Sequence, residues 1–143
     1  MDIRLPILHM NADYILPVAE KNYGICGLKN YRSGCYEAAR FIDSVGQEWF
    51  VESAEVLGYS SILQYLRWGN ENKSIKVKFY FRMGKKYSFD ELKGELEEFL
   101  LTKKLRGSPF QNKKKEVPLY MSKFNSLQQL VSEIGYFDSR AGI

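Results

Sequence analysis

The sequence is poor in the residues that carry most catalytic and metal chemistry. Its 143 residues include one histidine, His9, and two cysteines, Cys26 and Cys35. Structural zinc sites normally use four Cys or His ligands, so these three residues predict no metal centre. Nucleophile elbows, phosphate-binding loops, zinc-protease motifs and dinucleotide glycine patterns are all missing. A Ser–His or Cys–His pair would have to use His9, which lies in a short apolar run. We therefore expect no catalytic residue, no cofactor and no enzyme activity.

Long hydrophobic runs are missing as well. No apolar stretch approaches the roughly 18 to 20 residues that span a bilayer. The first residues are interrupted by Arg4 and Pro6 and do not form the basic start and apolar core of a signal peptide. We expect a cytoplasmic protein without membrane contact. There Cys26 and Cys35 are expected as free thiols, although a disulfide across the loop between them stays an alternative.

What the chain does contain is apolar residues and an uneven excess of positive charge. Hydrophobic residues make up 45% and aromatic residues 15%, enough to bury a core in one domain of 143 residues. Residues 1–70 hold six Lys or Arg and eight Asp or Glu, whereas residues 71–143 hold fifteen and nine. Two stretches, Lys73–Lys86 and Lys103–Lys115, each contain six cations and no anion. Such a basic half favours an anionic partner, whether nucleic acid, an acidic protein or an anionic surface.

The segment from Ile75 to Lys86 gives the clearest strand signal. Apolar and polar residues alternate strictly over its first eight positions, which predicts a strand with one face on a core and the other face in solvent. The inward set is Ile75, Val77, Phe79 and Phe81, and the outward set is Lys76, Lys78, Tyr80 and Arg82.

Other strand signals are weaker. Residues 38–43 and 47–57 flank a short turn with Gly46 and predict a β-hairpin. Asp43 and Glu48 beside this turn are explained by turn polarity. The first third of the chain has short apolar runs broken by prolines, typical of edge strands or irregular segments, followed by a glycine-rich loop. Residues 116–121 predict a further strand, confined to a sheet edge by Pro118.

Two helices are predicted. The first begins at Ser88, which forms a capping box with Glu91, and ends before Gly107. The second begins at Asn125 or Ser126 and ends at Gly135. Residues 60–68 fit either a helix or a strand. The fold class expected from this order is α+β, an antiparallel sheet with at least two helices packed on one face.

Three of these segments together resemble the small immunity proteins that accompany bacterial polymorphic toxins, including those of contact-dependent growth inhibition. They are "FIDSVGQEWFVESAEVLGY", "IKVKFYFRMGKKYSFDELKGELEEFL" and "FNSLQQLVSEIGYF", within residues 38–137. The resemblance is one of size, architecture and style. It implies a non-enzymatic protein that binds one cognate toxin and neutralises it. Many such inhibitors are acidic, whereas this chain is basic, so the implied toxin would present an acidic patch.

The basic stretches and one aromatic residue form the predicted partner-binding surface. The hypothesis assigns contact with the toxin to residues of the two basic stretches. Trp68 serves as an aromatic anchor because tryptophan is frequent at interface hot spots. The alternative hypothesis is a small nucleic-acid-binding protein that uses the same basic strand face and the second basic stretch. A third explanation is that the lysines only keep the strand soluble. The full predicted set is Trp68, Lys76, Lys78, Tyr80, Arg82, Lys85, Lys86, Lys103, Lys104, Arg106, Lys113, Lys114 and Lys115.

Overall fold

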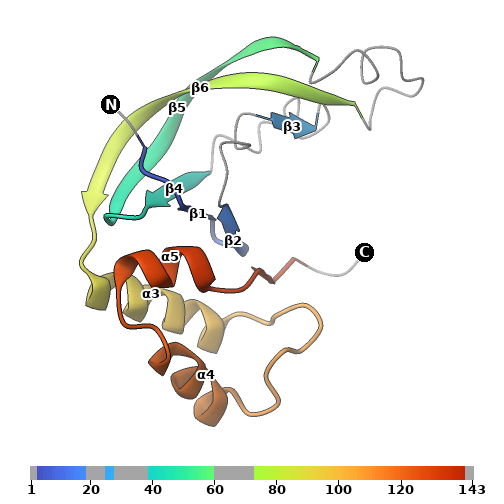
Figure 1. Ribbon diagram of the computed structural model, residues 1–143. Coiled ribbons are helices and arrows are strands. Elements are labelled where there is room, and N and C mark those ends of the chain that lie inside the picture. Colours follow the sequence, from blue (N-terminus) through green and yellow to red (C-terminus); the bar gives the residue numbers. More distant parts are fainter. Residues whose placement is uncertain (1–2, 19–24, 28–38, 60–72, 141–143) are drawn as a thin grey trace.

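The computed structural model describes residues 3–18, 25–27, 39–59 and 73–140 of the chain. These residues form an antiparallel sheet with helices packed on one face, so the predicted α+β class is confirmed (Figure 1). The strands are β1 (Ile7–Met10), β2 (Tyr14–Val18), β3 (Ile25–Gly27), β4 (Arg40–Asp43), β5 (Gln47–Tyr59), β6 (Ser74–Lys86) and β7 (Phe137–Asp138). The helices are α3 (Phe89–Thr102), α4 (Lys113–Ser122) and α5 (Leu127–Glu133).

The sheet of the described residues has the strand order β3-β6-β5-β4-β1-β2-β7, with every pair antiparallel. The predicted hairpin is β4 and β5, joined at Gly46, whose φ of 86° suits glycine. β6 confirms the strand predicted from its alternation. The prolines predicted edge strands or irregular segments for the first two runs, but β1 lies between β4 and β2, and β2 lies between β1 and β7, so both are inside the sheet.

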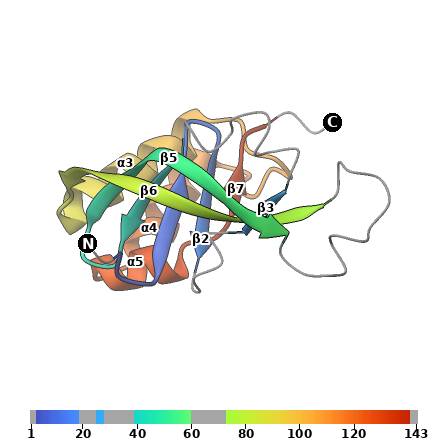
Figure 2. The ribbon, with the colours of Figure 1, turned by 90° about the horizontal axis from the view of Figure 1, so that it is seen from above.

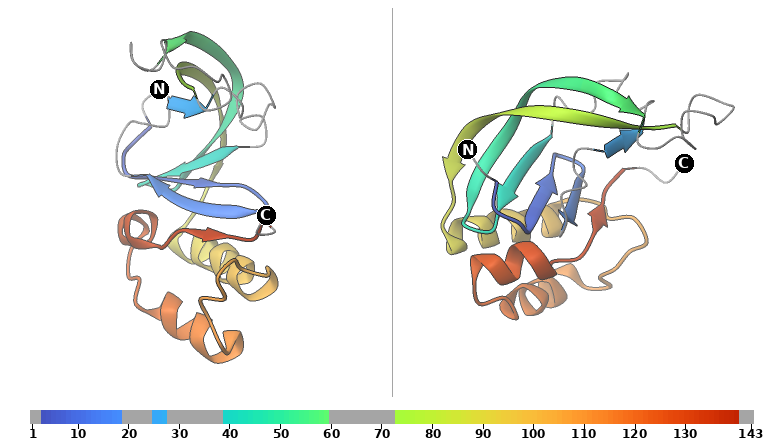
Figure 3. Two further views of the ribbon diagram at one scale, coloured as in Figure 1. Left: turned by 90° about the vertical axis from the view of Figure 1, so that its right-hand side faces the viewer. Right: turned by 45° about the horizontal axis from the view of Figure 1, so that its top comes forward.

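The strands β5 and β6 are much longer than the others and form a two-stranded arch, which we call the β5–β6 ribbon. Each has 13 residues, and three register irregularities interrupt their pairing. Irregularities of this kind bend and twist a strand pair. The ribbon consequently curves over one face of β4, β1 and β2, while the helices cover the opposite face (Figures 2 and 3).

Two apolar clusters follow from this layered arrangement. The first fills the space between the sheet and the helices, where buried side chains of β1, β2 and β4 meet those of α3, α4 and α5. The second lies between the sheet and the ribbon. In this second cluster the ring centre of Phe41 in β4 lies 5.7 Å from the ring centre of Phe81 in β6. Two of the inward residues of β6, Phe79 and Phe81, therefore pack on the second cluster.

Local signals explain where two of the helices begin. The predicted capping box of α3 is present, because Ser88 accepts a hydrogen bond from the Glu91 backbone and the Glu91 side chain accepts one from the Ser88 backbone. Of the two caps considered for α5, Ser126 is the residue that accepts from the backbone N–H of Gln129. Both helix predictions are confirmed.

The strand predicted for residues 116–121 is wrong, because these residues form the body of α4. Pro118 lies inside this helix, where it removes one backbone donor and disfavours helix. Val117 and Met121 are spaced by one helical turn, and both are fully buried against the helix-side cluster. Burial of two apolar side chains offsets a proline that faces solvent, so packing outweighs the local preference.

Candidate functional site

The outer face of the β5–β6 ribbon carries the core of the predicted surface. Lys76, Lys78, Tyr80 and Arg82 are all exposed there, while Ile75 and Val77 on the other side of the strand are buried. The predicted orientation of the strand is thus confirmed. This face belongs to the outermost layer, away from the helices, and no described helix or strand lies over it (Figure 2).

The neighbouring strand makes this face mixed in charge rather than purely basic. In the register of the ribbon Lys78 stands opposite Glu55, and the Tyr80 hydroxyl donates a 2.9 Å hydrogen bond to the Glu55 carboxylate. Glu52, at one of the irregularities, is exposed as well. The segment Lys73–Lys86 contains no anion, but its sequence does not tell which residues of β5 pair with it.

Aromatic rings hold two of the ribbon cations. The Lys78 ammonium lies 5.2 Å from the centre of the Tyr80 ring, and the Arg82 guanidinium lies 4.7 Å from that of Phe50. Contacts of this kind contribute about 0.5 to 1 kcal/mol at exposed sites. Neither cation forms an ion pair with any described residue, so both charges remain available to a partner.

Lys85 and Lys86, which end β6, have different surroundings. The Lys85 ammonium pairs with Glu91 in the first turn of α3 at 2.5 Å. The hydrogen bond with Glu91 raises the pKa of Lys85 above its usual value, and the same contact lowers the pKa of Glu91. Lys85 therefore joins the end of β6 to α3, whereas Lys86 has no carboxylate partner within the described ranges.

The second basic stretch lies on another part of the molecule. Lys103 follows α3, and its carbonyl accepts a hydrogen bond from the Lys113 ammonium at the start of α4. Both lie at the helix layer, on the opposite side of the sheet from the ribbon (Figure 1). The remaining members, all exposed, are Lys104, Arg106, Lys114 and Lys115. The structure thus divides the predicted surface into two separate basic regions.

Some predicted features lie outside the described residues. Trp68 is one of them, and so is Cys35, so the aromatic anchor and the state of the two cysteines remain predictions.

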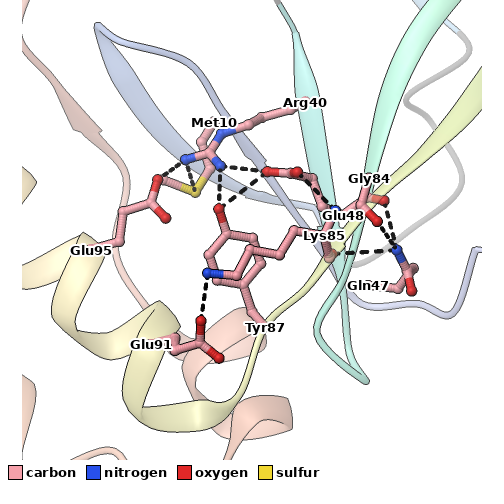
Figure 4. Close-up of polar contacts among 9 residues, drawn as sticks. All are labelled: Met10, Arg40, Gln47, Glu48, Gly84, Lys85, Tyr87, Glu91 and Glu95. Atoms are coloured by element: carbon pink, nitrogen blue, oxygen red, sulfur yellow. Dashed lines mark hydrogen bonds and ion pairs between the residues drawn. The ribbon is translucent and has the colours of Figure 1, made fainter.

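A buried polar cluster around Arg40 was missed by sequence reasoning (Figure 4). Arg40 donates to Glu48 at 2.6 Å and to the Tyr87 hydroxyl at 3.0 Å, and it also pairs with Glu95 of α3. Burial alone would lower the pKa of Arg40, but its hydrogen bonds to Glu48 and Glu95 outweigh burial and raise it above the usual value. Glu48 is therefore a buried ion-pair partner, not the turn residue expected.

The geometry around Arg40 is that of a structural tie. Its partners come from β5, from Tyr87 directly after β6 and from α3, so one guanidinium links the sheet to the helix layer. The side chain of Glu95 on α3 is partly exposed and pairs with Arg40 across the boundary between the two layers. Arg40 and Glu48 lie on neighbouring strands of the predicted hairpin, but Tyr87 and Glu95 lie 47 and 55 residues from Arg40, so no local signal could have assembled the whole cluster.

His9 is held by aromatic neighbours. Its Nε2 atom lies 3.1 Å from the Tyr14 hydroxyl, and its ring centre lies 4.6 Å from that of Phe41. Burial lowers the pKa of His9 from 6.5 to about 4, so the ring is neutral near pH 7. These contacts describe a packed side chain.

Neither the side chains of the described residues nor comparison with known proteins points to a further site. The described residues contain no group of three His, Cys, Asp or Glu side chains placed to hold a metal ion. Of the helices in the described ranges, none combines the length and apolar character of a bilayer-spanning helix. Comparison of the chain with models of protein families, with curated proteins and with solved structures found no match.

Proposed function

We propose that this chain is a binding protein that recognises a protein partner through the outer face of the β5–β6 ribbon. In line with the resemblance described above, the partner is a bacterial toxin domain, which the chain neutralises as an immunity protein. The observation that carries the proposal is the composition of this face, where Lys76, Lys78 and Arg82 are exposed and two of them, Lys78 and Arg82, lie over aromatic rings. Arginine and the aromatic residues Tyr and Trp are the most frequent hot spots of protein interfaces.

The acidic residues on the ribbon favour a protein partner over nucleic acid. A phosphate backbone laid along β6 would approach Glu55, which lies directly opposite Lys78. Tyr80 is the exposed ring a base would stack on, but the Lys78 ammonium lies over it and its hydroxyl is bonded to Glu55. A protein surface can meet such a mixed pattern with charges of both signs, which gives specificity.

Toxin binding is tested by genetics and by co-purification. The gene immediately upstream is expected to encode a toxin-like domain, and the two products are expected to elute together as a stable one-to-one complex. Deleting the gene for this chain should expose the cell to that product. An upstream gene without a toxin-like domain, or two products that elute separately at micromolar concentration, would contradict the proposal.

Nucleic-acid binding is the competing outcome. It predicts that RNA or DNA remains with the purified protein and that the affinity falls steeply with salt. Failure to bind either nucleic acid at low salt would remove this alternative.

A further inference from the structure

An open hollow lies at the end of the ribbon, beside the β4–β5 turn, and we call it the turn hollow. Its volume is about 390 Å³, within the range of sites that hold a small ligand or a few side chains. Trp49 of β5 and Met83 of β6 form its apolar part, and Arg4 and Lys86 supply two cations. Met83 and Lys86 directly continue the strand that carries the outer face of the ribbon.

The two cations of the turn hollow lack a counter-ion in the described part of the chain. Both Arg4 and Lys86 are exposed, and neither forms an ion pair there. The acid nearby, Asp43, is 1% exposed. One of its oxygens accepts from the backbone N–H groups of Val45 and Gln47, both at 3.0 Å, and the other accepts from the Trp49 indole at 3.1 Å. Asp43 is thus occupied by its own turn.

Met83 supplies the accessible apolar area of the hollow. Trp49 is almost fully buried, and its single N–H donor is used by Asp43. Met83 is half exposed, although methionine is a flexible apolar side chain that adapts to different partners. An exposed methionine beside a buried indole is a surface that a second apolar group can cover.

The walls of the turn hollow are fixed before any ligand arrives. The Gln47 side-chain amide donates to the carbonyl of Gly84 at 3.0 Å, which ties the turn to β6 next to Met83. The backbone N–H of Ser44 donates to the Arg4 carbonyl at 3.1 Å and holds the N-terminal segment against the same turn. A Cβ atom on Gly46 would lie 2.3 Å from the Tyr87 carbonyl oxygen, so the turn has little room to rearrange. Preorganised walls reduce the entropy cost of binding.

From this geometry we infer that the turn hollow binds the carboxylate of an acidic side chain on the protein partner, with a neighbouring apolar group seated on the exposed Met83 side chain, which lies beside the buried Trp49 indole. The inference rests on the proposed function for the identity of the partner. The carboxylate lies between Arg4 and Lys86, where it neutralises two unpaired cations. A second copy of this chain is a less suitable occupant of the turn hollow. The stretch Lys73–Lys86 beside the hollow is rich in cations, and these would repel the same basic residues of another copy.

The inference is tested without the partner by a small probe that carries both groups, phenylacetate. In a titration followed by NMR, the Met83 methyl and the Trp49 indole N–H are expected to shift, with a dissociation constant in the millimolar range, about the strength available to so small a ligand. Neutral phenylacetamide has the same shape and is expected to bind at least about five times more weakly, since a charge-assisted contact is lost. Trp68→Phe assigns the indole signal to Trp49.

Variants separate the turn hollow from general charge attraction. Arg4→Gln with Lys86→Gln should weaken phenylacetate binding by about tenfold, about two charge-assisted contacts at an exposed site. The matched control, Arg106→Gln with Lys114→Gln, removes two exposed cations from the helix layer and should leave binding unchanged. Equal binding of phenylacetate and phenylacetamide, equal loss in both double variants, or no shift at Met83 would each overturn the inference.

A third probe distinguishes carboxylate from phosphate. If phenyl phosphate shifts Met83 and phenylacetate does not, the hollow takes a phosphate and the inference is wrong. Its failure is separate from that of the proposed function. If the toxin complex forms but no carboxylate binds in the turn hollow, only the inference about the hollow is wrong. Carboxylate binding with no toxin partner would overturn only the proposed function.

Discussion

Replacing Arg40 with methionine is the sharpest test of how the sheet and the helix layer are joined. The substitution keeps an apolar stem of similar length and removes the guanidinium. Glu48, whose side chain is 6% exposed, is then left as a buried charge without its cation. Breaking a buried ion pair by removing one partner costs about 3 to 5 kcal/mol.

The structure places the expected cost at the lower end of that range. Glu48 keeps hydrogen bonds from the Tyr87 hydroxyl at 3.3 Å and from the Lys85 backbone at 3.2 Å, and these partly stabilise its charge. Glu95 is 36% exposed on its side chain, so loss of its pair adds at most about 1 kcal/mol. We expect Arg40→Met to lower the free energy of unfolding by about 3 kcal/mol.

Urea unfolding followed by circular dichroism measures this loss. With a denaturant slope of roughly 2 kcal/mol/M, the midpoint should fall by about 1.5 M. Adding Glu48→Gln to Arg40→Met removes the buried charge but keeps an acceptor for Tyr87, so about 2 kcal/mol should return. The matched control is Arg82→Met, an exposed arginine on an aromatic ring, with an expected loss below about 1 kcal/mol. A loss below 1 kcal/mol for Arg40→Met, or a double variant no more stable than it, would refute the reasoning.

Three further outcomes test other parts of the structure. Because the pKa of His9 is about 4 when folded and 6.5 otherwise, the unfolded chain binds more protons between these values, and stability is lost as the pH falls through this window. By about pH 4 the loss of unfolding free energy attributable to His9 should reach about 3 kcal/mol. Urea titrations at pH 7 and pH 4 measure this loss, and His9→Gln should abolish it. Equal acid sensitivity in both proteins would argue against burial of a neutral ring. Ser88→Ala should destabilise by about 1 kcal/mol through loss of the α3 cap, whereas Ser132→Ala on α5 serves as its control and should cost less. Pro118→Ala should raise the thermal midpoint, with a gain of about 1 kcal/mol or more, because a backbone donor is restored inside α4; a lower midpoint would count against the helix.

The fold was predictable wherever the signal is local. Alternation over a few residues predicted both faces of β6, and the spacing of Ser88 and Glu91 predicted the start of α3. The strand assigned to residues 116–121 failed because the burial of Val117 and Met121 depends on distant neighbours. Proline rules describe only the local cost.

The candidate site was predictable on one strand only. Lys76, Lys78 and Arg82 could be placed outward from the sequence, but Glu55 could not be placed opposite Lys78 without the register of the ribbon. The turn hollow depends on Arg4 and Lys86, which lie far apart in the chain. Contacts over such separations are set by tertiary packing, and periodicity carries no information about them.

The central claim is that the outer face of the β5–β6 ribbon binds a protein partner. Its most direct test is the affinity for the upstream toxin domain, measured by calorimetry, of the triple variant Lys76→Glu, Lys78→Glu and Arg82→Glu. We predict that the fold is kept, shown by an unchanged circular dichroism spectrum, and that binding weakens at least about 100-fold, which is about 3 kcal/mol. The control with Lys104→Glu, Arg106→Glu and Lys114→Glu should change affinity by less than about threefold. Unchanged binding in the ribbon variant, or an equal loss in the control, would contradict the claim.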